Sequence, residues 1–196
     1  MKLNLNFCYL GQPKSGKSSI IHYIFHKMSR KDTLQFPSTK TPEVNIYETS
    51  LLRITNLEIP GHYENLNDLP SEFVDKLAEQ DVFIYVHDLK FGESQTNTSH
   101  KQLREHFKKI NDKNPSAHLY ILFHQSDLDF LYLGNKVDES INVFKNKFEN
   151  FISEQFLEKR HATDRCHFHK TSIYDYSINK GDLISHKRCH LHHIVQ

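Results

Sequence analysis

Short apolar stretches of strand length recur along the chain, separated by stretches whose apolar residues have helical spacing. The predicted strands cover residues 5–10, 45–49, 51–59, 81–88, 117–124 and 166–171. The predicted helices cover residues 18–25, 71–80, 101–113 and 137–160. Residues 28–44 and 90–100 are polar or interrupted by proline, and both are predicted to be loops.

The order of these elements predicts the fold class. The second and third strands are separated only by a turn near residues 48–50, which indicates an antiparallel hairpin. The other connections between strands contain a helix, as parallel strands require. The sequence therefore predicts an α/β protein with a doubly wound, mostly parallel six-stranded sheet and one antiparallel edge strand. Ligands bind at the carboxyl ends of such strands, so we expect convergence of the loops at Gly11, Gly61, Gln125 and Ser172.

Composition narrows the class without identifying a function. The chain has 196 residues, enough for one α/β domain with a substantial core. Its formal net charge of +1 comes without a Lys/Arg block, so no nucleic-acid partner is expected. Cys8, Cys166 and Cys189 make no disulfide framework and suit a reducing compartment. Because no signal peptide or membrane-spanning run is recognisable, we expect a cytoplasmic protein without direct membrane insertion.

The segment from Gly11 to Ser18 fits the pattern Gly-x-x-x-x-Gly-Lys-Ser/Thr of a phosphate-binding loop. Glycines let main-chain N–H groups approach phosphate oxygens closely. Lys17 would place a positive charge at the β- and γ-phosphates, and the Ser18 hydroxyl would ligate Mg²⁺. A predicted strand precedes the loop and a predicted helix follows it, which is the context that favours phosphate binding over a chance glycine turn.

Two further segments suggest a nucleotide switch. Glu58-Ile59-Pro60-Gly61-His62 follows a strand, where a carboxylate can orient a Mg²⁺-bound water and a glycine N–H can contact a γ-phosphate. The simpler interpretation is a Pro-Gly turn. His124-Gln125-Ser126-Asp127 ends another strand, and the Asp127 carboxylate could accept hydrogen bonds from guanine. The simpler interpretation there is a polar loop.

Taken together, these residues resemble a Ras-related G domain of the Rag family of small GTPases, nearest the Rag C/D branch. The resemblance covers about residues 5–178 and is dense from Ser15 to Thr39. It recurs at Pro60-Gly61, Ile84-Tyr85-Val86-His87-Asp88, Asn114-Pro115, Thr171-Ser172-Ile173-Tyr174-Asp175 and the frame His124-x-x-Asp127. The resemblance implies a P-loop NTPase fold, with a Ras-like G domain over 1–178 and a tail or incomplete last helix over 179–196. The family's C-terminal roadblock-like domain has no counterpart in these 196 residues.

The resemblance also implies a binding site for GTP or GDP with Mg²⁺. The residues implied to hold the nucleotide are Lys14, Ser15, Gly16, Lys17, Ser18, Ser19, Thr33, Thr39, Gly61, His124, Asp127, Ser172 and Ile173. Those implied at the metal are Ser18, Thr39 and, through water, Glu58. Catalysis would depend on Lys17 and on His62, if the His62 imidazole orients a water; otherwise His62 is a solvated switch residue.

Three departures from the family pattern fall in the nucleotide site. Leu57-Glu58 replaces Trp-Asp, so the carboxylate is one methylene longer. His62 replaces a glutamine, and Gln125 replaces a lysine whose stem packs along the base, which predicts weaker nucleotide holding. Together these changes favour slow or degenerate GTP hydrolysis.

The leading hypothesis is a Rag-type guanine-nucleotide switch with slow hydrolysis. The resemblance implies protein partners, including a Rag A/B-like GTPase and switch-binding regulators, and nutrient signalling through the TOR pathway at a lysosomal or vacuolar membrane. The alternative is a pseudo-GTPase that serves as a structural or interaction module. An adenine-directed phosphate-loop enzyme is disfavoured by Asp127. A zinc site from Cys166, His167 and His169 with the tail residues Cys189, His190 and His193 fits no standard spacing, and a solvated tail is preferred.

Overall fold

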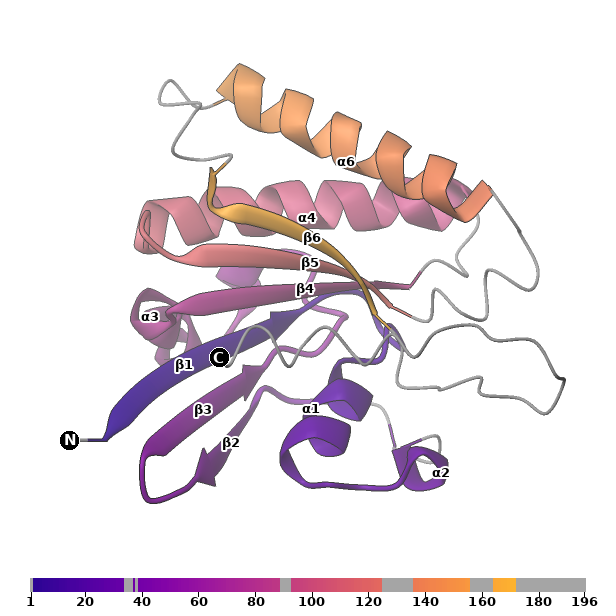
Figure 1. The fold of residues 1–196 in the computed structure, drawn as a ribbon. Coiled ribbons are helices and arrows are strands. Elements are labelled where there is room, and N and C mark those ends of the chain that lie inside the picture. The colour runs from indigo at the N-terminus through magenta and orange to yellow at the C-terminus, as the bar shows by residue number, and fades with distance from the viewer. Residues whose placement is uncertain are drawn as a thin grey trace, which may run out of the picture.

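A mixed sheet forms the centre of the protein in this computed structural model, which describes residues 2–33, 37, 39–88, 93–124, 136–155 and 164–171. In that part of the chain six strands pair in one sheet: β1 (Leu3–Leu10), β2 (Glu43–Glu48), β3 (Leu52–Glu58), β4 (Val82–Asp88), β5 (His118–His124) and β6 (Cys166–Thr171). Their order across the sheet is β2-β3-β1-β4-β5-β6 (Figure 1). Only β2 runs antiparallel to its neighbour in this sheet, so the predicted fold class is confirmed.

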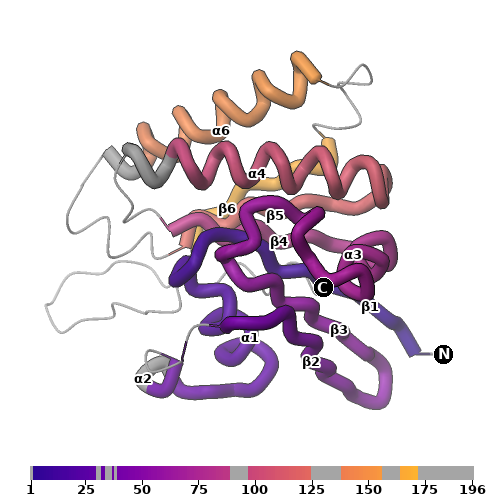
Figure 2. The backbone as a smooth tube through the Cα atoms, turned by 180° about the vertical axis from the view of Figure 1, so that it is seen from behind, coloured from indigo at the N-terminus to yellow at the C-terminus, as the bar shows by residue number. Residues whose placement is uncertain are grey.

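Helices cover both faces of the sheet. Those described are α1 (Lys17–Phe25), α2 (Arg30–Thr33), α3 (Ser71–Lys76), α4 (Glu93–Lys113) and α6 (Lys136–Gln155), with 3₁₀ turns at Leu66–Asp68 and Leu77–Glu79. Figure 1 shows α4 and α6 side by side on one face and α1 on the other, and the view from behind in Figure 2 agrees. This two-sided covering explains why the central strands are apolar along their whole length rather than in alternation.

Each face has its own hydrophobic cluster. Cys8 and Leu10 of β1 point to the α4/α6 side, where they pack with Phe107 of α4 and Phe148 of α6. The α1 side holds the alternate strand residues, and its members are Phe7, Tyr9, Ile20, Ile21, Phe25, Ile54, Ile84, Val86 and Leu122. The phenylalanines of the predicted helix 137–160 were expected in the core. Phe144, Phe148 and Phe151 are buried there, while Phe156 lies outside the described residues.

One predicted loop is wrong. Residues 90–100 were expected to be irregular because they carry no apolar stripe, but α4 already begins at Glu93. The buried face of this first part of α4 is polar and finds partners on β4. Ser99 Oγ lies 2.9 Å from the Tyr85 hydroxyl and 2.8 Å from His87 Nδ1. Hydrogen bonds, rather than apolar contacts, anchor this part of the helix, so hydrophobic periodicity could not reveal it.

Smaller differences concern element ends. The short helix α2 falls within the predicted loop 28–44, and β2 begins at Glu43 rather than Asn45. The predicted helix 71–80 is α3 followed by a 3₁₀ turn at Leu77–Glu79. Helix α6 is described to Gln155, so the predicted end near residue 160 lies outside the described residues.

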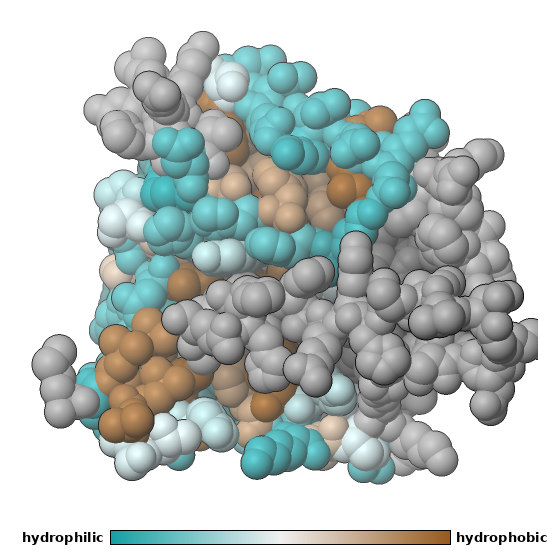
Figure 3. Space-filling view, viewed as in Figure 1, coloured by the Kyte–Doolittle hydropathy of each residue, from teal (hydrophilic) through white to brown (hydrophobic). Residues whose placement is uncertain are grey.

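Exposed apolar side chains gather at the amino-terminal edge of the sheet. Leu3 of β1 is 56% exposed and Leu51 of the β2–β3 turn is 73% exposed, and the Leu3 N–H donates to the Leu51 carbonyl at 2.9 Å. This region is the brown area at the lower left of Figure 3. It lies at the amino ends of the parallel strands. Ligands bind at the opposite, carboxyl ends of the strands in such sheets.

The interface between β4, α4 and α6 buries several histidines. His87, His100 and His106 are each at most 7% exposed. Burial is the main cause that lowers the pKa of each to about 4, and positive neighbours add to this effect for His100. All three are therefore neutral in the folded protein at neutral pH.

These buried histidines predict acid sensitivity. In the unfolded chain histidine titrates near pH 6.5, so the unfolded state binds more protons as the pH falls from about 6.5 towards 4. The free energy of unfolding should therefore fall over this range, by about 1.4 kcal/mol per pH unit for each histidine. Urea unfolding at pH 7, 6 and 5 measures this dependence.

The variant His100→Phe provides the control. Phe suits the aromatic contacts that His100 makes with Phe144 and Phe148 and removes one titrating group. The free energy of unfolding of this variant should fall less steeply with pH, by about 1.4 kcal/mol per pH unit, because one titrating histidine is missing. A free energy of unfolding that is flat between pH 7 and 5 in the parent protein would contradict the assignment.

Candidate functional site

A pocket of about 560 Å³ opens at the carboxyl ends of β1 and β3. Three segments build its walls: the turn after β1 with the start of α1, the stretch before β2, and the loop after β3. The lining residues are Pro13, Lys14, Gly16, Lys17, Ser18, Ser19, Thr33, Pro37, Thr39, Lys40, Glu58, Pro60, Gly61 and His62. The loops at Gly11 and Gly61 thus converge as predicted.

The turn between β1 and α1 has an unusual backbone. Gly11 has φ 130° and Gly16 has φ 96°, values that side-chain-bearing residues rarely adopt. Lys14 between them also has a positive φ of 63°. The turn delivers the chain directly into α1, with Gly16 as the residue that precedes the helix. The N–H groups of the first turn of α1 are therefore at the pocket, where they favour an anion.

The ammonium of Lys17 is enclosed by the same turn. Its Nζ donates to the carbonyl oxygens of Gly11 and Gln12, each at 2.9 Å, and the side chain is only 5% exposed. Burial lowers the pKa of Lys17 to about 8, while the nearby Glu58 carboxylate acts in the opposite direction. A buried cation at a pocket wall is held ready for a negative ligand.

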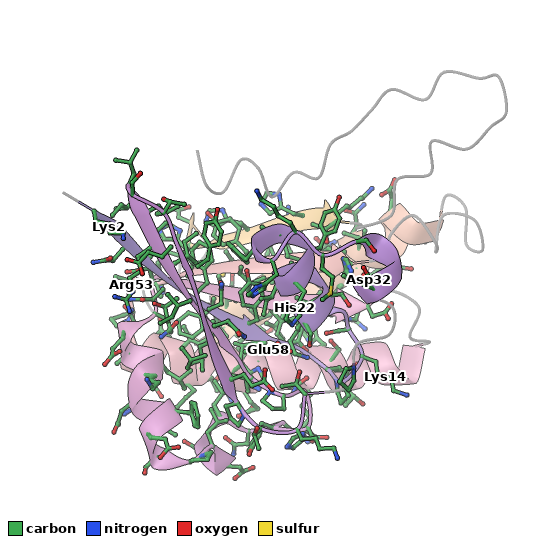
Figure 4. All side chains as sticks on the ribbon, turned by 90° about the horizontal axis from the view of Figure 1, so that it is seen from below. Lys2, Lys14, His22, Asp32, Arg53 and Glu58 are labelled. Carbon is green, nitrogen blue, oxygen red and sulfur yellow. The ribbon has the colours of Figure 1, made fainter. Side chains whose placement is uncertain are left out.

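Three oxygen-bearing side chains meet beside Lys17. Ser18 Oγ donates to Glu58 Oε1 at 2.6 Å, and Thr39 Oγ1 donates to the same oxygen at 3.0 Å. The two hydroxyl oxygens are 3.0 Å apart. Figure 4 shows Glu58 near the centre of the view and Lys14 to the right of it. Ser18 lies in α1, Thr39 in the stretch before β2 and Glu58 at the end of β3, so their meeting is a property of the fold.

The loop after β3 lies directly against the predicted phosphate-binding loop between β1 and α1. A Cβ added at Gly61 would come within 2.1 Å of Pro13 N and 2.3 Å of the Gln12 carbonyl carbon. Glycine is thus the residue that lets these two walls of the pocket touch. His62, the next residue, is exposed, and its ring lies tilted by 33° against that of Tyr63, with ring centroids 4.4 Å apart.

His124 lies behind the turn rather than in the pocket. It is 1% exposed, its Nδ1 is 3.2 Å from Thr171 Oγ1, and a Cβ at Gly16 would approach its Cδ2 to 2.5 Å. His124 therefore links the ends of β5 and β6 to the turn at Gly16.

Comparison with known proteins places this geometry in a family. The Gtr1/RagA G protein conserved region matches residues 7–181. The chain belongs to this Rag family. It is 29% identical over 170 residues to the GTP-binding protein GTR2 of Saccharomyces cerevisiae, over 86% of this chain and 46% of that protein. It is 28% identical to the human Ras-related GTP-binding protein C, over 86% of this chain and 40% of that protein.

These relatives confirm the predicted resemblance to a Rag C/D-like G domain. The chain spans less than half the length of the two relatives. Among solved structures, it is similar to the mammalian SRP receptor, with a TM-score of 0.63 and 13% identity, over 85% of this chain and 90% of that one. It is also similar to the Arl6 BBS3 small GTPase from Trypanosoma brucei, with a TM-score of 0.58 and 13% identity, over 87% of each chain. At this identity these structures support the small-GTPase fold alone.

The structure brings most of the predicted Rag-type site residues together. The predicted residues that line the pocket are Lys14, Gly16, Lys17, Ser18, Ser19, Thr33, Thr39, Glu58, Gly61 and His62. Ser15 is buried, and its Oγ has no hydrogen-bond partner among the described residues. Gln125, Asp127, Ser172 and Ile173 lie outside the described residues, so the guanine side of the site stays a prediction. The boundary predicted at residue 178 does too.

Sequence reasoning missed other residues at the pocket. Lys40 lines it as a further cation, and its position directly after Thr39 was the signal that could have found it. Gln102 and His106 of α4 contact the loop at Gly61 and Tyr63 from behind. Their signal is weak, because polar residues on one face of an amphipathic helix are ordinarily solvated.

The described part of the chain holds neither a metal-ligand cluster nor a membrane-spanning helix. No cluster of three or more His, Cys, Asp or Glu side chains there could hold a metal ion. Cys189, His190 and His193 lie outside it. Among the described residues, no helix is both long enough and apolar enough to span a bilayer.

The contact between Gly61 and the turn predicts a steric effect of Gly61→Ala. The added methyl meets main-chain atoms of Gln12 and Pro13, which cannot rotate away, so the two loops must separate. We expect a loss of about 1–3 kcal/mol in the free energy of unfolding, measured by urea titration. His62→Ala at the neighbouring exposed position is the control and should change stability by less than about 0.5 kcal/mol. Equal effects of the two variants would show that the loops do not touch.

Proposed function

We propose that the protein is a guanine-nucleotide-binding switch that takes GTP or GDP together with Mg²⁺. The observation that carries this proposal is the meeting of a buried lysine with three oxygen-bearing side chains at the start of α1. Lys17, Ser18, Thr39 and Glu58 all line one pocket of about 560 Å³. Membership of the Rag family and the printed names of its GTP-binding relatives support the choice of guanine nucleotides.

Phosphate binding follows from the charges and donors at the turn. Lys17 and the first N–H groups of α1 present positive charge to the pocket, and the exposed Lys14 and Lys40 add more at its rim. Lys17 now donates to two carbonyls of its own loop. A phosphate group would give its ammonium a fully charged acceptor, which is a stronger partner than a carbonyl.

The donor set beside Lys17 suits Mg²⁺. With metal–oxygen distances of about 2.05 Å, adjacent ligands of an octahedral ion are about 2.9 Å apart. Ser18 Oγ and Thr39 Oγ1 are 3.0 Å apart, so both hydroxyls fit as neighbouring ligands. Glu58 accepts a hydrogen bond from each and would hold them in place, directly or through a water. The ion would neutralise phosphate charge when bound.

The proposal also covers the base and the catalytic step. We propose that Asp127 accepts hydrogen bonds from guanine, that Ser172 and Ile173 close over the base, and that buried His124 supports this region. His62 lines the pocket and is exposed, so it is the side chain placed to meet a water near the phosphates. Hydrolysis would be slow, because His62 stands at the position of the family's glutamine. The charge of Lys17 would then be the main contribution of the protein to the rate.

Signalling would then depend on how the loops at the pocket contact the nucleotide. Thr39 and Gly61 both line the pocket, so a third phosphate would make contacts with both loops that a diphosphate does not make. We propose that protein partners read these loops, among them a Rag A/B-like GTPase and regulators. Recruitment to a lysosomal or vacuolar membrane in the TOR pathway would come through such partners. Support for this step comes from similarity to GTR2 and to Ras-related GTP-binding protein C.

A second candidate function is a pseudo-GTPase that serves as an interaction module. The observation that favours it is the direct contact of the Glu58 carboxylate, one methylene longer than the family's aspartate, with both hydroxyls that would ligate the metal. Single-turnover incubation with radiolabelled GTP separates the two functions. Release of phosphate above the rate in buffer supports a switch, and GTP that stays intact while bound supports the module.

The proposal predicts Mg²⁺-dependent guanine-nucleotide binding that requires Lys17. Fluorescent GDP and a non-hydrolysable GTP analogue, titrated with Mg²⁺ or with EDTA, measure it. Lys17→Ala should weaken binding at least about 100-fold, because it removes a buried, charge-assisted hydrogen bond to phosphate. Lys101→Ala, an exposed lysine on α4, is the matched control and should bind like the parent protein.

The proposal is overturned if the parent protein binds no guanine nucleotide. Equal loss in the two lysine variants would also count against it, because it would place the phosphates elsewhere. Binding that is unaffected by EDTA would remove Mg²⁺ from the site while leaving nucleotide binding intact.

A further inference from the structure

Two side chains of α4 hold the loop that forms one wall of the pocket. Gln102 Nε2 donates to the Gly61 carbonyl at 3.3 Å and to the Tyr63 carbonyl at 3.2 Å. His106, one helical turn further on, lies with Nε2 3.2 Å from the Tyr63 carbonyl. Gln102 is 4% exposed and His106 is 1% exposed, so both donor side chains are buried. We call this pair the α4 clamp.

The amide of Gln102 is used at both ends. Its Oε1 lies 3.2 Å from the Tyr85 hydroxyl, which is also 2.9 Å from Ser99 Oγ. If the amide were flipped, its oxygen would face two carbonyl oxygens, which cannot donate a hydrogen bond, and its NH₂ would face the Tyr85 hydroxyl. Two N–H groups matched to two carbonyls therefore fix the orientation. Glutamine at this position supplies a donor pair that neither an apolar side chain nor a carboxylate can supply.

His106 completes the clamp as a neutral donor. Burial lowers the pKa of His106 to about 4, although its bonds to the loop act in the opposite direction. The ring is therefore neutral at physiological pH, and the proton lies on Nε2, because a carbonyl oxygen can only accept. Its Nδ1 is buried and has no partner among the described residues. The main described role of this imidazole is thus its bond to Tyr63.

The held carbonyls lie on either side of His62. Bonds from α4 fix the peptide units at Gly61 and at Tyr63, and the loop adds its own bond from the Tyr63 N–H to the Pro60 carbonyl at 3.2 Å. On its other side Gly61 packs against Gln12 and Pro13. The segment is therefore held between α4 and the predicted phosphate-binding loop. The His62 side chain lines the pocket.

We propose that Gln102, assisted by His106, is a positioning residue that presets the Gly61–His62 segment for a nucleoside triphosphate. A nucleoside triphosphate carries one phosphate more than a diphosphate. If its phosphate chain starts at Lys17, this additional phosphate can reach the loop at Gly61. A segment already held in place favours the longer ligand, because no ordering cost is paid on binding. The inference rests on the proposed function, since it assigns the nucleotide specificity of the same pocket.

The variant Gln102→Met tests the clamp with a side chain of similar size. It leaves two buried carbonyls without these bonds and should release the segment. Gln80→Met is the matched control. Gln80 is also 4% exposed and its Nε2 donates to the Lys76 carbonyl at 2.7 Å, but it precedes β4, away from the pocket. Both variants lose a buried amide, so a general packing effect should appear in both.

The decisive readout is the ratio of affinities for GDP and for a non-hydrolysable GTP analogue, measured with Mg²⁺. Gln102→Met should weaken the triphosphate about tenfold relative to the diphosphate, as expected for the loss of two neutral hydrogen bonds. Gln80→Met should keep the parent ratio. Hydrogen exchange of the free protein adds a readout that needs no nucleotide. The amides of Tyr63 and Glu64 should exchange about tenfold faster in Gln102→Met, whereas β4 stays protected.

The outcomes separate this inference from the proposed function. If the parent protein binds neither nucleotide, both the proposed function and the nucleotide preference are wrong, and hydrogen exchange alone reports on the clamp. If it binds both and Gln102→Met leaves the ratio unchanged, the function stands and the inference is overturned. His106→Leu removes only the bond to Tyr63 and should shift the ratio in the same direction by less. It serves as the test if Gln102→Met does not fold, and an unchanged ratio would again overturn the inference.

Discussion

The buried ammonium of Lys17 is the constraint on which the rest of the site depends. A cation that is 5% exposed needs partners, and the turn after β1 provides them by directing the carbonyls of Gly11 and Gln12 towards it. That turn needs the positive φ values of Gly11 and Gly16. It also places Ser18 beside Glu58 and leaves room for Gly61 to pack against it. The pocket walls are therefore arranged around one charge.

Support for these walls comes from the opposite face of the sheet. Tyr85 of β4 contacts Ser99 and Gln102 of α4, and Gln102 reaches the loop at Gly61. A polar network thus runs through the interior from the sheet to the pocket. It is buried and bonded to defined partners, so it gives the loop one preferred position. The same interior accounts for the low pKa values of His87 and His106.

The sequence predicted the sheet, its order of elements and most pocket residues. This was possible because the phosphate-type turn and the residues from Glu58 to His62 are contiguous, and their spacing carries the chemistry. The start of α4 at Glu93 was not predicted, because hydrogen bonds from Ser99 anchor it and leave no apolar period. Gln102 and His106 lie within the predicted helix 101–113, but their contact with the pocket loop was not predicted. Their role depends on a partner some forty residues away in the chain, which no local pattern records.

The most direct test of the account is the proton linkage of nucleotide binding. Lys17 has a pKa of about 8 in the free protein, so about half of the side chains are neutral at pH 8. A phosphate ligand stabilises the charged form, so GDP with Mg²⁺ should bind with uptake of about half a proton at pH 8 and less at pH 7. Calorimetry in buffers of different ionisation enthalpy measures this number. Binding without proton uptake at pH 8 would contradict the account, because Lys17 would then either be fully charged in the free protein or not meet the phosphates.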